Sequence, residues 1–189
     1  MQNNPFQVLQ ITPTEFEIQV ENWLKHSCKA LKNFRVTHLE KIEGDSGEYE
    51  IDVIAELEIF NGALIKVLVE CKHYKSPIKR DVLMILEAKL RDTGSHKGII
   101  FTTSKFQSGA LKYAQARGIA TVIVQDGKAS YGTKSFEQSF ALPSWRPHYK
   151  YIGWMTTLNE QENEAHHLIA DNYNDAIKEW LNLPTQIFQ

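Results

Sequence analysis

The chain has 189 residues, of which 42% are apolar and 23% charged, the balance of a soluble globular protein. A single domain of this length buries roughly 70% of its unfolded surface. Two cysteines, Cys28 and Cys71, make no disulfide framework and fit a reducing compartment. The chain lacks a run of about 18 apolar residues and a signal peptide, so we expect a cytoplasmic protein without a membrane partner.

The charged residues are unevenly distributed along the chain. From Lys72 to Arg117, ten lysines and arginines stand against three acids, a balance of +7, so the net charge of −2 leaves −9 for the remainder. This asymmetry is typical of a phosphate-facing surface on an acidic body. For a charge pattern alone, solvated helix faces are the more common explanation.

The first predicted element is a helix from Thr12 to about Leu31. Thr12 as N-cap, Pro13 at the first helical position and Glu15 form a capping box. An extended stretch over 34–42 and a polar turn at 44–47 follow, and then two strands within GEYEIDVIAELEIFNGALIKVLVECKHYK, residues 47–75. Helical spacing after the cap is followed by Phe16, Val20, Trp23, Leu24 and Leu31.

The next predicted elements alternate between helix and strand. A helix follows Ser76-Pro77 and ends at Thr93-Gly94, and a second helix covers 106–117. GIIFTTS and IATVIV are short apolar strands, and each follows a helix, so both should join the sheet in parallel through right-handed crossovers. The predicted fold is an α/β sandwich with an antiparallel hairpin at its front. The inner face of the first of these helices carries Val82, Ile85, Leu86, Lys89 and Leu90.

The character of the chain changes after Thr133. An aromatic, turn-rich connector leads into a predicted helix from Glu160 to Leu183. We therefore divide the chain into a domain at 1–133 and a C-terminal extension at 134–189 with one helix. The extension is either docked on the domain or an interaction segment.

The register of the hairpin decides which charged side chains are neighbours. A two-residue Asn61-Gly62 loop puts Asp52 and Glu70 on opposite faces. A three-residue loop with Gly62 left-handed in a G1 bulge pairs residues whose numbers sum to 122, and it leaves one face wholly apolar. We predict the second register, in which Asp52 and Glu70 are cross-strand neighbours with Cβ atoms roughly 5 Å apart. Its apolar pairs are Leu57/Ile65, Ala55/Val67, Val53/Val69 and Ile51/Cys71.

Two carboxylates this close repel each other unless one is protonated or a cation lies between them. Mg²⁺ accepts a couple of carboxylates and keeps several waters for chemistry. Lys72 lies on the face of Glu70, where its ammonium can hold an attacking water and offset charge on a phosphate. The alternative is a plain salt bridge between Asp52 and Lys72 at the strand end.

The spacing of Asp52, seventeen intervening residues and Glu70-Cys71-Lys72 resembles the core of the PD-(D/E)xK nucleases. VECKHYK and KGIIFTTSKFQSGALKYAQARGI resemble the Mrr-type restriction endonuclease catalytic domain, and the resemblance covers about residues 12–127. It implies a restriction-endonuclease-like three-layer sandwich, with helices on both faces of a mixed central sheet. This chain departs from the family at Glu70, where Gln is common, and in a longer approach to Asp52 that leaves Asp45 unassigned.

The resemblance also implies roles for individual residues. Asp52 and Glu70 would bind Mg²⁺, with Mn²⁺ as a substitute, and the main-chain carbonyl of Cys71 would complete the metal site. Lys72 would assist the nucleophile. Glu17 matches a first-helix glutamate that faces the site, although it also fits an ordinary exposed helix position. The expected DNA contacts are Lys75, Lys79, Arg80, Thr102, Thr103, Ser104 and Lys105, of which Thr102, Thr103 and Ser104 could instead close the strand and cap the next helix.

These residues together predict a metal-dependent DNA endonuclease that hydrolyses phosphodiester bonds in the restriction of foreign or modified DNA. The expected partners are DNA, a second copy in a homodimer and a separate recognition subunit. Two alternatives stay open: a junction-resolving or repair nuclease of the same fold, and a non-catalytic module that binds nucleic acid or protein.

Overall fold

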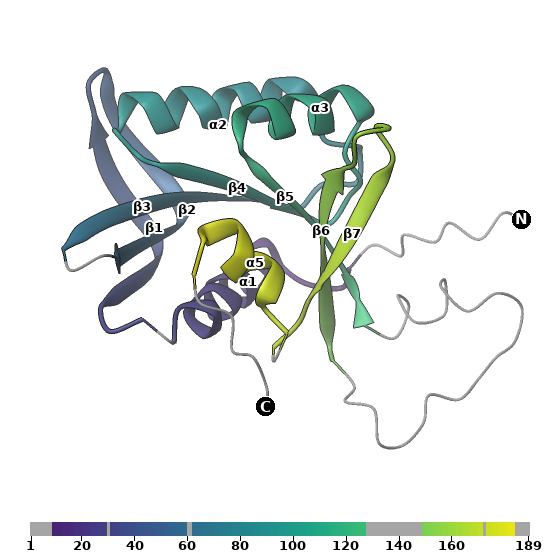
Figure 1. The fold of residues 1–189 in the computed structure, drawn as a ribbon, viewed down its shortest axis with the longest axis horizontal. Helices are drawn as coiled ribbons and strands as arrows, with labels where there is room; N and C mark the ends of the chain where they lie inside the picture. The colour runs from purple at the N-terminus through teal and green to yellow at the C-terminus, as the bar shows by residue number, and fades with distance from the viewer. Residues whose placement is uncertain (1–8, 30, 60–61, 128–148, 172, 184–189) are drawn as a thin grey trace, which may run out of the picture.

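The computed structural model describes residues 9–29, 31–59, 62–127, 149–171 and 173–183. One seven-stranded sheet runs through it in the order β1-β2-β3-β4-β5-β6-β7, with helices on both faces (Figure 1). This confirms the predicted α/β sandwich. The strands are β1 (Phe34–Gly44), β2 (Gly47–Ile59), β3 (Ala63–Lys72), β4 (Lys97–Thr102), β5 (Ala120–Asp126), β6 (Tyr151–Leu158) and β7 (Glu164–Ile169). The helices are α1 (Pro13–Cys28), α2 (Arg80–Asp92), α3 (Ser108–Arg117) and α5 (Asp175–Leu181).

The sheet is mixed, as predicted. β1, β2 and β3 form an antiparallel meander, β3, β4 and β5 are parallel, and β5, β6 and β7 are antiparallel again. α2 and α3 make the two crossovers and cover one face, while α1 and α5 cover the other (Figure 1). Because the parallel strands β3 and β4 both end toward the same edge, the residues that follow them lie close together.

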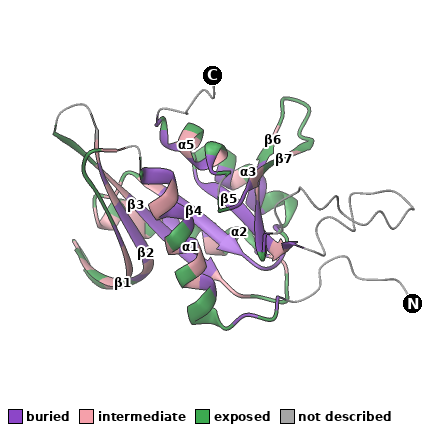
Figure 2. Ribbon diagram, turned by 90° about the horizontal axis from the view of Figure 1, so that it is seen from below, coloured by how far each residue is buried: buried purple, intermediate pink, exposed green. Residues whose placement is uncertain are grey.

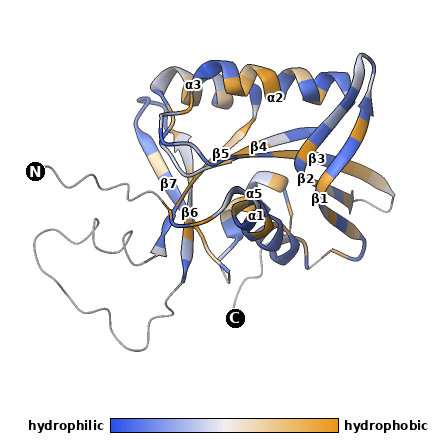
Figure 3. Ribbon diagram, turned by 180° about the vertical axis from the view of Figure 1, so that it is seen from behind, coloured by the Kyte–Doolittle hydropathy of each residue, from blue (hydrophilic) through white to orange (hydrophobic). Residues whose placement is uncertain are grey.

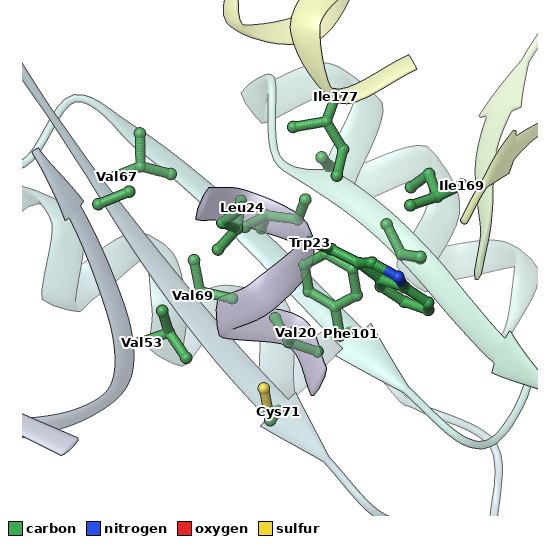
Figure 4. Close-up of a cluster of buried hydrophobic side chains, with 14 of the residues drawn as sticks. Val20, Trp23, Leu24, Val53, Val67, Val69, Cys71, Phe101, Ile169 and Ile177 are labelled. Atoms are coloured by element: carbon green, nitrogen blue, oxygen red, sulfur yellow. The ribbon is translucent and has the colours of Figure 1, made fainter. Parts of the chain in front are cut away.

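Helix α1 forms as its sequence predicts. Thr12 accepts a hydrogen bond from the Glu15 backbone, and the Glu15 carboxylate bonds back to Thr12, so the capping box is complete. The buried face packs Val20, Trp23 and Leu24 against the sheet in the first core cluster (Figure 4). The same cluster includes Val69 and Cys71, so this packing holds α1 beside the end of β3.

The second core cluster lies between the sheet and the α2–α3 pair. Leu83 and Leu86 are its buried α2 residues, whereas Ile85 is 59% exposed, so the predicted inner face was wrong at Ile85. The reason is the close approach of α2 to β4 at Gly98, where an added Cβ would lie 2.8 Å from Leu90 and 3.1 Å from Leu86. Figures 2 and 3 show buried and apolar residues along the central strands between the helix pairs.

The predicted hairpin register is confirmed between Val53 and Ile59, but the ladder stops before the predicted pairs Asp52/Glu70 and Ile51/Cys71. The ladder runs from Val53↔Val69 to Ile59↔Ala63, and Gly62 has a positive φ of 126°. Residues 60–61 of the turn lie outside the described residues.

One face assignment in the hairpin was wrong. Ile51 packs in the α2–α3 cluster, although Val53 and Cys71 pack in the α1 cluster. The cause lies in β1, where Leu39 has a φ of +49° between the pairs His38↔Val53 and Glu40↔Ile51. This left-handed residue lies opposite Asp52, and there the side chains of both strands exchange faces.

The predicted helix from Glu160 to Leu183 was wrong. The chain makes β6 on the edge of β5, turns at Asn159, returns as β7, and becomes helical only in α5. The Asn159 side chain accepts the backbone N–H groups of Gln161 and Asn163, which fixes the turn. The division at residue 133 falls outside the described residues and stays a prediction.

Candidate active site

Asp52 lies where β2 leaves β3. The last ladder pair is Val53↔Val69, and beyond it Asp52 Oδ2 accepts a hydrogen bond of 2.6 Å from the backbone N–H of Cys71. Beyond the last backbone pair of the ladder, the Asp52 side chain therefore takes the place of a β2 backbone acceptor for the N–H of Cys71 near the end of β3. Lys72 Nζ lies 2.5 Å from Glu70 Oε2 and 3.9 Å from Asp52 Oδ2, so one ammonium lies against both carboxylates.

Glu70 is 5% exposed and carries a cation on each carboxylate oxygen. Lys72 binds Oε2, and Lys89 of α2 binds Oε1 at 2.5 Å. Burial opposes the charged form of Glu70, but the charges and hydrogen bonds of Lys72 and Lys89 outweigh burial and lower its pKa. Burial likewise opposes the ammonium of Lys72, yet Glu70 and Asp52 raise its pKa overall.

Lys89 was not predicted as a site residue. Its sequence signal was its position among the apolar residues of the predicted inner face of α2, where a charge needs a partner. The described residues show that partner to be Glu70.

Asp52 has the opposite electrostatic character. Burial raises the pKa of Asp52, and the negative charges of Glu70 and Glu17 raise it further. The hydrogen bond from the Cys71 N–H and the charge of Lys72 lower this pKa, but they do not outweigh the other causes. A carboxylate that is costly to ionise beside another carboxylate is a typical position for a bound cation.

Glu17 comes to the site from α1. Its Oε2 lies 2.7 Å from His38 Nε2, and its side chain is 15% exposed. Its negative charge adds a smaller contribution to the burial and the Glu70 charge that raise the pKa of Asp52. His38 gave no sequence signal. Glu17 also borders a cavity of about 190 Å³, which is lined by Pro13, Phe16, Glu17, Cys71, Lys72, His73 and Tyr74.

The thiol of Cys71 is part of the core beside Val20 and Val69 (Figure 4). Burial raises its pKa well above the ordinary thiol value, so the side chain is no nucleophile. Burial also raises the pKa of Cys28 to about 12. The main-chain carbonyl of Cys71 as a metal ligand stays a prediction.

Thr102, Thr103 and Ser104 are buried at the end of β4. The Thr102 hydroxyl donates to the Lys72 carbonyl at 2.9 Å, and the Thr103 hydroxyl donates to the Tyr74 carbonyl at 3.1 Å. Ser104 donates its backbone N–H to the Thr102 hydroxyl. These contacts fix the chain just after β3, and a direct phosphate contact stays a prediction.

The other expected DNA contacts lie exposed at the same edge: Lys75, Lys79, Arg80 and Lys105. The backbone N–H of Ile78 donates to the Lys105 carbonyl at 2.9 Å, which brings the segment after β3 beside the segment after β4. Arg80 stacks on the ring of Tyr113, 4.7 Å from its centre. The segments that follow β3 and β4 therefore present exposed basic side chains.

The donor set suits a hard divalent ion that keeps most of its waters. Asp52 and Glu70 offer two carboxylates, which matches the way Mg²⁺ is usually held. The described part of the chain has no group of three or more His, Cys, Asp or Glu side chains placed around one point, so a fully protein-ligated ion, as in structural zinc sites, does not fit. The Lys72 ammonium against both carboxylates marks this place as favourable for a cation.

A mixed sheet with helices on both faces, and a carboxylate pair with a lysine at the end of β3, is consistent with a restriction-endonuclease-like fold. Residues 8–129 match the Mrr_cat family, described as restriction endonuclease, and the chain belongs to this family. No curated protein matches the chain. A solved structure titled "Crystal Structure of Protein of Unknown Function AF1548" is 24% identical with a TM-score of 0.44. The match covers 56% of this chain and 56% of that one.

The described residues also include no helix that is long and apolar enough to cross a membrane.

Proposed function

We propose that the chain is a metal-dependent DNA endonuclease that hydrolyses phosphodiester bonds. The observation that carries the proposal is the Asp52–Glu70–Lys72 cluster, in which a buried carboxylate, a second carboxylate of raised pKa and an ammonium meet. Membership of a restriction endonuclease family supports the same reaction.

In this reaction Asp52 and Glu70, together with the main-chain carbonyl of Cys71, would hold Mg²⁺, and Mn²⁺ would substitute for it. The chemistry that the bound ion supplies is a water of lowered pKa and a polarised phosphoryl oxygen. Lys72 leaves its position against the two carboxylates and donates hydrogen bonds through Nζ to the attacking water. Glu17, paired with His38, lies on the α1 side of the same site and keeps negative charge near Asp52.

The DNA backbone would lie along the exposed basic residues that follow β3 and β4. Lys75, Lys79, Arg80 and Lys105 would neutralise phosphates, which accounts for affinity without sequence reading. Thr102 and Thr103 would keep the Lys72–Tyr74 segment in position below that backbone.

The biological role that we propose is restriction of foreign or modified DNA in the cytoplasm. Base contacts would come from a separate recognition subunit, because phosphate contacts alone specify no sequence. A homodimer would supply one active site to each DNA strand. The extension at 134–189 would then be an addition to a catalytic domain at 1–133.

The test is cleavage of supercoiled plasmid, linear duplex, branched duplex and methylated duplex with Mg²⁺, Mn²⁺ or EDTA. The proposal expects metal-dependent nicking of plasmid that EDTA stops, and a methylated duplex cut in preference to a branched one. Preference for the branched duplex would favour a junction-resolving or repair nuclease. Binding of DNA without cleavage of any substrate would favour a non-catalytic module.

A further inference from the structure

The two oxygens of Glu70 have different surroundings. Lys72 lies against Oε2 and is also within 3.9 Å of Asp52, so its ammonium faces two carboxylates. Lys89 lies against Oε1, and among the described residues Glu70 is its one ion-pair partner. A cation on the Lys72 side therefore gains two carboxylates, whereas a cation on the Lys89 side gains one.

The two lysines also differ in how they reach Glu70. Lys72 is two residues along the same strand as Glu70, and its side chain is 22% exposed. Lys89 comes from the last turn of α2, next to Leu86 and Leu90, which pack against Gly98 of β4. Its side chain is 19% exposed and Glu70 is 7% exposed at the side chain, so their contact is largely shielded from water.

From these contacts, and resting on the proposed metal-dependent cleavage, we infer that Lys89 takes the place of a second metal ion and limits the site to one divalent ion per chain. In two-ion sites the ions lie about 3.5–4 Å apart, a spacing at which one carboxylate could bind both ions through its two oxygens. Here the second oxygen of Glu70 is already neutralised by an ammonium fixed on a helix.

A second ion would have to displace that ammonium and would find few ligands. The described residues offer no cluster of three or more metal-ligating side chains near Glu70 or elsewhere. A displaced Lys89, whose side chain is 19% exposed, would lose its one ion-pair partner among the described residues. Lys72 can leave its position because a divalent ion replaces it against both carboxylates.

The experiment counts Mn²⁺ ions bound per chain, by titration with Mn²⁺ alone and electron paramagnetic resonance of the free ion. Wild type should bind one ion. Lys89→Glu supplies a carboxylate where the ammonium was, so it should bind two ions and show the spin coupling of a manganese pair. Lys112→Glu, which makes the same charge change on exposed α3, should bind one.

The outcomes separate the inference from the proposed function. Two ions on wild type would overturn the inference and leave the nuclease proposal standing. No ion on wild type would overturn the proposed metal site itself. If Lys89→Glu does not fold, the Lys89→Gln variant provides the test. Removal of the positive charge should lower the dissociation constant of the first Mn²⁺ ion at least severalfold. A higher dissociation constant would overturn the inference and show instead that Lys89 orients Glu70.

Discussion

Replacement of Lys72 by methionine should separate catalysis from stability. Lys72 donates to Glu70 at 2.5 Å and lies 3.9 Å from Asp52, and the variant lacks the ammonium that we propose holds the attacking water. Loss of one such charged group costs about 10²–10³ in rate. Folding should change far less, because Lys89 still neutralises Glu70 through its other oxygen.

The magnitudes follow from the number of ammonium groups left on Glu70. Lys72→Met or Lys89→Met alone leaves one, and each should lower the free energy of unfolding by about 1–2 kcal/mol. The double variant leaves a buried carboxylate with no counter-ion, which costs about 3–5 kcal/mol. The double variant should therefore exceed the sum of the single variants by about 1 kcal/mol.

The assay is urea unfolding in EDTA for wild type, both single variants and the double variant, with plasmid nicking in Mg²⁺ alongside. Lys75→Met, an exposed lysine three residues along, is the control and should stay within about 0.5 kcal/mol of wild type. Additive free energies in the double variant, or a Lys72→Met protein that cuts as fast as wild type, would refute the reasoning.

Three further outcomes are expected. The pKa of Glu70 is lowered in the folded protein, so the charged carboxylate stabilises the fold above the unfolded pKa of about 4.3, and this stabilisation disappears as the pH falls through the folded pKa. Glu70→Gln should therefore lower the free energy of unfolding at about pH 7. Urea unfolding should show that this difference shrinks below about pH 4. Cys28 and Cys71 have raised thiol pKa values, so neither should react with a thiol reagent at pH 8 until the chain unfolds, and rapid labelling would contradict their burial. Asp171→Ala removes the acceptor that lies 2.9 Å from the indole nitrogen of buried Trp23. Calorimetry should therefore show that the free energy of unfolding falls by about 1–3 kcal/mol. A fall of less than about 0.5 kcal/mol would show that water replaces the carboxylate.

The hairpin at the centre of the site was predictable because two local constraints agree. Alternation of apolar residues requires one buried face, and a bulged turn at Gly62 is the register that supplies it. This register places Asp52, Glu70 and Lys72 close together, and no contact with a distant segment is needed to predict it. That is why the proximity of Lys72 to Asp52 and Glu70 was predictable from the sequence.

The parts that were missed depend on contacts between distant segments. The exchange of faces at Ile51 depends on Leu39 in a left-handed conformation, which leucine rarely adopts and which no sequence pattern marks. Lys89 was visible on a helix face, but its partner depends on how α2 packs across β4.

The C-terminal region failed for another reason. Leu168 and Ile169 fit helical spacing with Ile177, but pairing of β7 with β6 decides that they are extended. The spacing of apolar residues within one segment cannot distinguish a helix from an edge strand when the strand that it pairs with lies elsewhere in the sequence.

The measurement that tests the central claim most directly compares two aspartates on the same hairpin. Asp52→Asn and Asp45→Asn remove the same charge, but Asp52 lies in the acidic pair and Asp45 in the exposed turn between β1 and β2. With Mg²⁺ and supercoiled plasmid, we predict nicking by wild type and by Asp45→Asn, and none by a folded Asp52→Asn protein. Nicking by Asp52→Asn at the wild-type rate would contradict the account.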